Sequence, residues 1–311
     1  MPTRQEQISG GLIGLLVGDA LGVPYEFHSP HSLPPQDQIE FEPPPRFDRA
    51  HGGTPPGTWS DDGAQALCLL ASLLECGGFE ANDFGQRLLN WYEQGYLAVD
   101  SRVFDVGITT AAALRAIRAG TPALKAGLRG EHDNGNGALM RVLPLALWHR
   151  GSDTELVNDA HLQSQVTHGH LRSQVCCALY CLWARRVLEE CPDPWPAAVA
   201  ALREIYAGRA EATGELEGSI RPDEAPRGGG SGYVVDCLRS AHLTVQTGGY
   251  EQVVKAAIAL GHDTDTTACV AGGIAGLRDG VEAIPVRWRD GLRGRELYEP
   301  LLDALLARVM R

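Results

Sequence analysis

The amino-acid sequence predicts an all-α fold built from many helices in a single domain. Apolar residues recur at the spacing of amphipathic helices in several segments. Three such stripes are Leu67, Leu70, Ala71 and Leu74; Val175, Ala178, Leu179 and Leu182; and Val253, Val254, Ala257 and Ile258. Alternating runs typical of strands are scarce, although a tract such as 142–147 is compatible with a helix or a short strand. The 44% hydrophobic content of the 311 residues is ample for a large core.

The first expected helix lies within the apolar run Gly10–Val23. This run contains Asp19, has only Arg4 as a basic residue upstream, and precedes no clear cleavage site, so a signal peptide is disfavoured. It is also too short to span a membrane. We therefore expect a helix of the protein core and no membrane association.

Two stretches interrupt the helical pattern. Residues 28–58 are crowded with proline and glycine, and residues 208–232 are polar and rich in helix breakers. Loops of this length are usually functional lids or disordered insertions. Because the helices on both sides need partners for their apolar faces, we expect one domain over residues 1–311.

Charge and cysteine content restrict the class of protein. The net charge of −12 argues against a broad nucleic-acid-binding face. Cys176, Cys177 and Cys181 share one apolar stretch, and no CxxC pair occurs among the eight cysteines. This pattern indicates reduced thiols in a cytoplasmic protein rather than a zinc site or a disulfide framework. We expect a monomer.

Acidic and hydroxyl residues cluster at two expected helix starts. Ser60, Asp61 and Asp62 precede the stripe that begins at Leu67, and residues 263–267 read Asp-Thr-Asp-Thr-Thr. Either cluster alone can be a helix cap. However, a cap needs one side-chain oxygen, and adjacent carboxylates repel each other unless a positive charge compensates them. If the two starts meet, their oxygens can hold two Mg²⁺ or Mn²⁺ ions about 4 Å apart.

Three further segments have the composition of ligand-binding loops. Residues 18–27 deliver Glu26 into the proline-rich stretch. Gly135 and Gly137 flank Asn136, and such a turn can present backbone N–H groups to a phosphate, although it can also be an ordinary loop. Asp105 precedes two threonines, where it can be either a site residue or a helix cap.

In this order, the segments resemble the ADP-ribosylglycohydrolase family, which includes dinitrogenase reductase-activating glycohydrolases and vertebrate ADP-ribosylarginine and ADP-ribosylserine hydrolases. The resemblance rests on "GLLVGDALGVPYEF", "PGTWSDDG", "FDVGITT", "GNGALMR", "SQVTHGH", "SGYVVDCL" and "GHDTDTTACVAGGIAGL". These motifs cover nearly the whole chain up to Leu277.

The resemblance implies a compact orthogonal helix bundle with two Mg²⁺ or Mn²⁺ ions at the base of an ADP-ribose cleft. The residues that match the metal ligands are Ser60, Asp61, Asp62, Asp263, Asp265 and Thr266. Those that match substrate-binding positions are Gly135, Asn136, Gly137, His168, Gly232 and Tyr233, with the phosphates near Asn136 and Gly137 and the adenine near Tyr233. Glu26 matches an acidic residue on a mobile loop that closes over the metals, and Asp105 matches a carboxylate near the scissile ribose.

The chain departs from the family pattern at a few positions. The family triplet reads Thr-Asp-Asp followed by Thr, whereas this chain has Ser60 at its start and Gly63 after it. Serine keeps the hydroxyl but restricts its rotamer less than threonine does. Ile108 stands where relatives commonly have a polar residue. These changes bear on substrate choice.

The expected reaction is hydrolysis at the anomeric C1 of an ADP-ribosyl group, with release of ADP-ribose. Glu26, or a metal-bound carboxylate such as Asp62, is the expected base. The substrate is an ADP-ribosylated protein or a small ADP-ribose conjugate, and we expect an arginine linkage. The alternatives are a serine or O-acetyl linkage, a relative that binds ADP-ribose without catalysis, and a metal-dependent phosphohydrolase.

Overall fold

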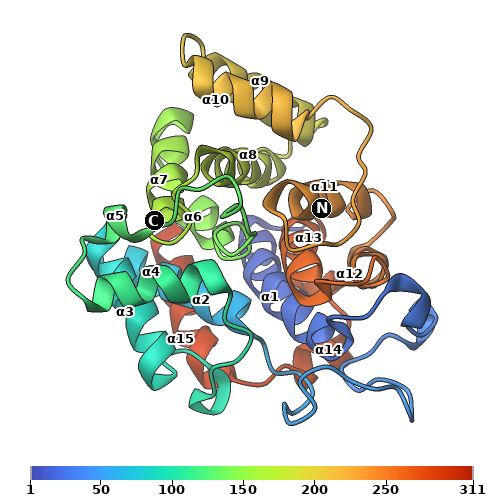
Figure 1. Cartoon of the computed structure of the whole chain (residues 1–311). Helices are drawn as coiled ribbons and strands as arrows, with labels where there is room; N and C mark the ends of the chain where they lie inside the picture. The colour runs from blue at the N-terminus through green and yellow to red at the C-terminus, as the bar shows by residue number, and fades with distance from the viewer. Residues whose placement is uncertain (1, 310–311) are drawn as a thin grey trace.

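The structure is a computed structural model and describes residues 2–309. Fifteen α-helices account for most of these residues, and no strand occurs among them, as the sequence predicts (Figure 1). The tract 142–147, whose sequence is compatible with either a helix or a short strand, falls almost entirely in helix α6. Two isolated β-bridges, between Leu128 and His168 and between Gly135 and Tyr233, are the extended pairings among the described residues.

Most helices follow one another along the chain with short connections, and the longer connections are residues 23–60, 95–107, 127–142 and 215–233. The α-helices are α1 (Arg4–Gly22), α2 (Asp61–Cys76), α3 (Ala81–Gln94), α4 (Ile108–Arg118), α5 (Ala123–Ala126), α6 (Leu143–Trp148), α7 (Asp153–Gln165), α8 (Leu171–Leu188), α9 (Pro194–Ile205), α10 (Ala210–Gly214), α11 (Val234–Thr244), α12 (Tyr250–Ile258), α13 (Thr264–Asp279), α14 (Val286–Gly291) and α15 (Arg295–Val309). Short 3₁₀ turns are η1 (Val23–Tyr25), η2 (Pro30–Ser32), η3 (Gln36–Gln38), η4 (Val99–Ser101) and η6 (Val281–Ala283), and η5 (Glu215–Ile220) is a π-helix.

Helices α1 and α13 lie side by side at the centre of the molecule (Figure 1). Glycines let their backbones touch: a Cβ on Gly14 would lie 2.6 Å from the Gly272 carbonyl oxygen, and a Cβ on Gly276 would overlap the Gly10 carbonyl. At the other end, a Cβ on Gly22 would overlap the backbone of Asp265. This contact therefore sets the end of α1 directly against the beginning of α13.

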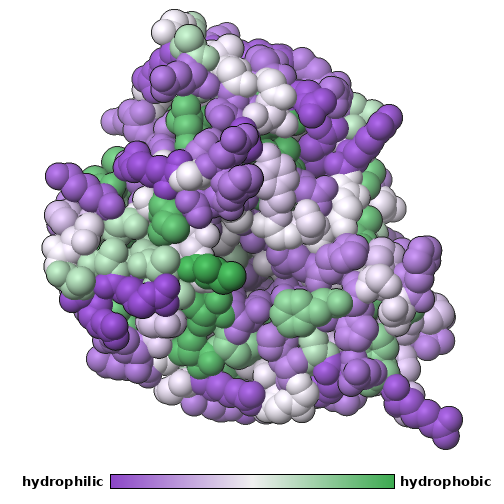
Figure 2. Space-filling model, viewed as in Figure 1, coloured by the Kyte–Doolittle hydropathy of each residue, from purple (hydrophilic) through white to green (hydrophobic). Residues whose placement is uncertain are grey.

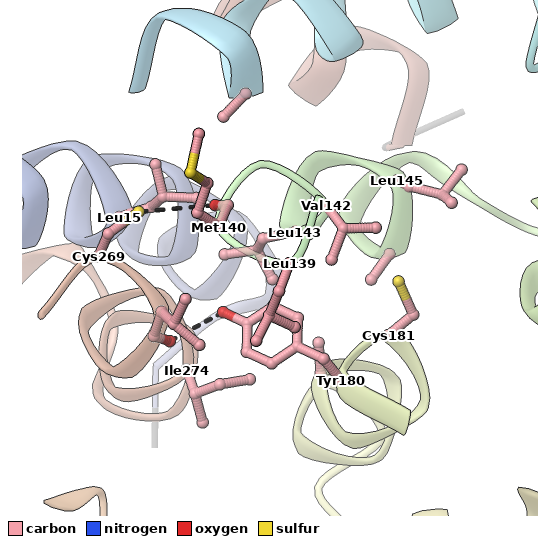
Figure 3. Close-up of a cluster of buried hydrophobic side chains, with 14 of the residues drawn as sticks. Leu15, Leu139, Met140, Val142, Leu143, Leu145, Tyr180, Cys181, Cys269 and Ile274 are labelled. Carbon is pink, nitrogen blue, oxygen red and sulfur yellow. Dashed lines mark hydrogen bonds between the residues drawn. The ribbon is translucent and has the colours of Figure 1, made fainter. Parts of the chain in front are cut away.

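The predicted apolar stripes of α2, α8 and α12 form part of the core. Figure 3 shows side chains from α1, α6, α8 and α13 meeting below the connection that contains Met140. Two hydrogen bonds tie α13 to its neighbours: the Tyr180 hydroxyl donates to the Val270 carbonyl (2.9 Å) and the Cys269 thiol to the Met140 carbonyl (3.6 Å). The core thus holds α13 from two sides.

The first expected helix is confirmed as a core helix. The segment Arg4–Tyr25 is long and apolar enough to cross a membrane, but 89% of its most apolar window is buried inside the fold. All eight cysteines are free, as predicted, and six of them are buried.

The two breaker-rich stretches differ. Residues 28–58 contain no α-helix, and Glu40 ties them to the C-terminal part by accepting hydrogen bonds from Arg287 and from the Trp288 indole N–H (2.5 Å). Residues 208–232 were predicted to be a loop, and this prediction is wrong for the first half, which forms α10 and η5. Leu216 and Ile220 are fully buried there and Ala212 is buried as well, so a few apolar residues among polar ones pack this segment against the core.

Candidate active site

The two acidic helix starts meet, and the end of α1 holds both of them. Asp19, fully buried near the end of α1, accepts hydrogen bonds from the backbone N–H groups of Ser60 (2.9 Å) and Gly63 (2.8 Å) at the start of α2. The Thr264 hydroxyl at the start of α13 donates to the Gly22 carbonyl (2.8 Å). One helix end therefore fixes both starts.

Direct contact between the starts is a hydrogen bond from the Thr266 hydroxyl to Asp62 Oδ1 (3.4 Å). Helix α13 begins at Thr264, so Asp265 and Thr266 lie in its first turn. Asp263 precedes the helix as its N-cap residue. Ser60 caps α2 by accepting the Asp62 N–H (3.3 Å).

The departure at Gly63 has a packing reason. A Cβ at this position would lie 2.8 Å from Leu16 Cδ2 and from Trp59 Cγ. Such distances are shorter than real side-chain contacts, so the threonine of the family pattern would require the Trp59 region to shift. Gly63 is therefore matched to its surroundings in this chain.

These residues open into a cleft of about 280 Å³. The predicted residues that line it are Glu26, Asp61, Asp62, Asp105, Gly135, Asn136, Gly137, His168, Gly232, Asp263 and Thr266. Ser60 and Asp265 are buried and do not line the cleft. Tyr233 lines an adjoining hollow of about 420 Å³, which shares Gly135 and Gly232 with the cleft. The structure thus brings almost all predicted site residues to one place.

Two carboxylate oxygens in this cluster have no hydrogen-bond partner: Asp62 Oδ2 and Asp265 Oδ2, both buried. Burial raises the pKa of the Asp61, Asp62 and Asp265 carboxyls well above their usual value, and the neighbouring carboxylates raise it further. Buried charged oxygens without a partner are costly. Hard oxygen donors in this state fit Mg²⁺ or Mn²⁺, so the residues present satisfy the requirement for divalent cations.

A second acidic group, around Glu26, adjoins the start of α13. Glu26 Oε2 is 2.6 Å from His51 Nε2, and Glu26, His51 and Asp105 each place one polar atom within 4.8 Å of the others. Glu26, Asp263 and Asp265 likewise each place one carboxylate oxygen within 4.8 Å of the others. Burial raises the pKa of Glu26 to about 10, with a further contribution from Asp105, and burial lowers the pKa of His51.

Asp105 lines the cleft and does not cap a helix. Helix α4 begins after Gly107 with no side-chain cap. Asp105 itself adopts a left-handed backbone (φ 55°), a conformation that aspartate tolerates better than most residues. Its pKa is raised by burial.

The glycine-rich turn joins a second loop beside the cleft. The Asn136 N–H donates to the Gly232 carbonyl (3.0 Å), so that group does not point to a phosphate, and Asn136 Nδ2 donates to Asp263 Oδ2 (2.9 Å). A Cβ on Gly137 would lie 2.8 Å from His168 Cε1, which explains glycine at this position. Burial lowers the pKa of His168 to about 3, so this imidazole is neutral.

Behind the cleft, the fully buried Arg141 connects the acidic wall to His168. Its guanidinium donates to Gln65 Oε1 (2.8 Å) and to the Thr167 hydroxyl (2.8 Å). Gln65 Nε2 in turn donates to Asp61 Oδ2 (2.8 Å), and the Thr167 hydroxyl is 2.8 Å from His168 Nδ1. This chain of hydrogen bonds fixes Asp61 and His168 in one arrangement.

The sequence-based prediction missed Asp19, His51 and Arg141. Asp19 and Arg141 interrupt apolar runs, and a charged residue in such a run must find buried partners, so this signal was available. His51 lies among breakers without any periodic pattern, and only the folded loop brings it to Glu26.

A protein-family model described as ADP-ribosylglycohydrolase matches residues 1–311. The chain belongs to the ADP-ribosylglycohydrolase family. This confirms the resemblance that the motifs indicated. The family and its named relatives are ADP-ribosyl hydrolases, so the protein is an enzyme of the glycohydrolase class.

Individual ADP-ribosylglycohydrolases match along their length. The chain is 31% identical to the ADP-ribosylarginine hydrolase Tri1 of Serratia proteamaculans over 96% of this chain and 79% of that protein. It is 28% identical to the ADP-ribosyl-[dinitrogen reductase] glycohydrolase of Rhodospirillum rubrum, over 98% of this chain and 97% of that protein. A solved structure described as an ADP-ribosylglycohydrolase-related protein complex superposes with a TM-score of 0.77 at 32% identity, covering 98% of each chain.

Proposed function

We propose that this protein is a metal-dependent ADP-ribosylarginine hydrolase that acts on modified protein. The linkage is supported by the similarity to the ADP-ribosylarginine hydrolase Tri1 and by the acidic walls of the cleft, which suit a cationic guanidinium leaving group. The observation that carries the metal dependence is the pair of buried, unpartnered oxygens on Asp62 and Asp265.

Two groups of residues would hold the cations. Ser60, Asp61 and Asp62 contribute oxygens from the start of α2, and Asp263, Asp265 and Thr266 contribute them from the start of α13. When bound, two divalent cations supply Lewis-acid polarisation and orient the ribose hydroxyls. The α1–α13 contact keeps the two groups at a constant separation.

Glu26 is the better candidate for the base. Its carboxylate faces the cleft and is held through one oxygen by His51, whereas Asp62 Oδ2 is buried at the helix start. Cations bound beside Glu26 would lower its raised pKa, so that the carboxyl is ionised and can accept a proton. A water oxygen adds to C1 of the ribose, its proton passes to Glu26, and the bond from C1 to the guanidine nitrogen breaks. The leaving guanidine takes up the proton from Glu26, so it departs as guanidinium and Glu26 returns to its carboxylate.

The remaining substrate contacts follow from the shape of the cleft. The space beside Gly135, Gly137 and His168 accepts the pyrophosphate, and the neutral His168 can offer one ring N–H as a donor. The adjoining hollow at Tyr233 accepts the adenine end. We further propose a cytoplasmic, monomeric enzyme, consistent with eight free cysteines.

The decisive test measures release of free ADP-ribose from three substrates: an ADP-ribosyl-arginine peptide, an ADP-ribosyl-serine peptide and O-acetyl-ADP-ribose. We expect the arginine peptide to be cleaved fastest with Mg²⁺ or Mn²⁺ and not at all with chelator. Asp263→Asn should lower the rate at least about a hundredfold, because it removes a metal-binding carboxylate.

Asp37→Asn is the matched control, because Asp37 is exposed and lines neither the cleft nor the adjoining hollow. Activity that persists in chelator or in Asp263→Asn would contradict the metal centre. Faster cleavage of the serine peptide or of O-acetyl-ADP-ribose would instead replace the arginine linkage by an O-linkage.

A further inference from the structure

Large apolar side chains are exposed beside the acidic cleft. Ile108 is 87% exposed and Phe27 is 71% exposed, the two highest values among the exposed large hydrophobic residues of the described chain. In Figure 2, apolar surface borders the central hollow of this face. Isolated apolar residues on a surface are normal, but two at the mouth of one cleft suggest a contact surface.

Both residues are fixed in position. Ile108 lines the cleft as the first residue of α4. Phe27 directly follows Glu26, and its backbone N–H donates to the His262 carbonyl (2.6 Å). The protein therefore presents these side chains to solvent on ordered backbone.

Half-buried neighbours extend this surface. The Phe27 ring centroid is 5.6 Å from that of His51, which is 5.0 Å from that of Phe104. Phe104 precedes Asp105, and Val106 lines the cleft beyond it. We name Phe27, Phe104, Val106 and Ile108 the apolar rim.

The apolar rim surrounds a floor of opposite character. Glu26, Asp61, Asp62, Asp105 and Asp263 line the same cleft as Val106 and Ile108, and all five are far less exposed than Ile108 and Phe27. A ligand that enters from solvent thus meets apolar side chains first and carboxylates next. A polypeptide segment with a cationic modified side chain between apolar neighbours is complementary to both layers.

Resting on the proposed function, we propose that the apolar rim binds the polypeptide around the modified residue and makes the enzyme selective for ADP-ribosylated arginine with apolar neighbours. The ADP-ribosyl group fills the cleft, and the residues beside the arginine pack on Ile108 and Phe27. Free ADP-ribosyl-arginine occupies the cleft but lacks the flanking residues that pack on Ile108 and Phe27.

The test compares three arginine-modified substrates: a peptide with leucine on both sides of the modified arginine, a matched peptide with serine at those positions, and free ADP-ribosyl-arginine. We expect the wild-type enzyme to have a roughly tenfold higher kcat/KM for the leucine peptide than for the serine peptide, mainly through a lower KM. Ile108→Ser should reduce this preference, because its kcat/KM for the leucine peptide should fall by a larger factor than its kcat/KM for the serine peptide or for free ADP-ribosyl-arginine.

Ile108→Val keeps the apolar surface and is the matched control. Phe27→Asn tests the second highly exposed residue of the rim, because asparagine tolerates the positive φ of Phe27 (64°). A thermal melt of each variant shows that the fold is intact.

Equal kcat/KM for the two peptides in the wild type, or an equal loss on all three substrates in Ile108→Ser, would overturn the role of the rim. Failure of the proposed function would look different, because the wild-type enzyme would then release no ADP-ribose from any of the three.

Discussion

At the residue scale, the state of a few carboxyl groups dominates the chemistry of the cleft. Asp265 is fully buried; its Oδ1 accepts the Thr266 N–H (2.9 Å), while its Oδ2 has no partner. Burial and the charge of Glu26 raise the pKa of Asp265 well above its usual value. Without bound cations, the burial of this carboxyl therefore lowers the free energy of unfolding.

The substitution Asp265→Asn tests this cost. In chelator, we expect it to raise the free energy of unfolding by about 1–3 kcal/mol, because a neutral amide replaces a buried carboxyl among other carboxyls. The same substitution should reduce the rise in melting temperature that Mg²⁺ causes in the wild type. Thermal melts with and without Mg²⁺ measure both effects, with Asp37→Asn as the control. A stability loss in chelator, or an unchanged Mg²⁺ response, would contradict this account.

At the element scale, the backbone contact between α1 and α13 sets the geometry of the cleft. Gly10 and Gly14 of α1 meet Gly276 and Gly272 of α13, and Gly18 meets Ala268. Close backbone approach of this kind allows helix ends to be placed with little freedom. The start of α13 consequently lies against the end of α1, where Asp19 also holds the start of α2.

The substitution Gly276→Ala should disturb this contact. Its Cβ would overlap the Gly10 carbonyl oxygen, so the helices must separate. We expect a loss of at least about 1–3 kcal/mol of unfolding free energy, although alanine alone favours a helix by about 1 kcal/mol over glycine. Denaturant unfolding measures the loss. Gly214→Ala in α10 is the matched control, because nothing lies within 4 Å of a Cβ there. Equal stability of both variants would show that α1 and α13 can separate without cost.

At the scale of the whole molecule, clustered carboxyls make stability depend on pH. Burial raises the pKa of Asp19 to about 7 and of Glu26 to about 10, and raises that of Asp61, Asp62 and Asp265. A group with a raised pKa in the folded state binds more protons there than in the unfolded chain, so its stabilising contribution falls as pH rises. Histidines with lowered pKa, such as His149 and His161 at about 4, act in the opposite direction below about pH 6.5.

Between about pH 7 and pH 8, these histidines are neutral in both the folded and the unfolded state and do not change the stability. The carboxyls therefore determine how the free energy of unfolding varies with pH in this window. We expect the melting temperature of the protein in chelator to fall as pH rises through this window. Saturating Mg²⁺ should remove most of this slope, because bound cations replace the protons. Differential scanning calorimetry in the two conditions measures the slopes. A melting temperature in chelator that rises with pH would show that the carboxyls are not buried as described.

The sequence by itself determined the helical class, the two acidic helix starts and most residues of the cleft. Helical stripes and paired Asp and Thr residues are local signals, and they are readable because burial and capping impose them on neighbouring positions. The prediction of a loop over residues 208–232 fails in its first half because Leu216 and Ile220 are too few to form a recognisable helical pattern among polar residues.

Only the tertiary structure decided which of these segments meet. Ser60 and Asp263 lie two hundred residues apart, and their proximity depends on glycine contacts along α1 and α13 that show no hydrophobic pattern. His51 joins Glu26 through a folded loop, and Arg141 reaches Asp61 through Gln65. Such long-range polar contacts leave no periodic trace in the chain, because each partner satisfies a burial requirement that arises only after folding.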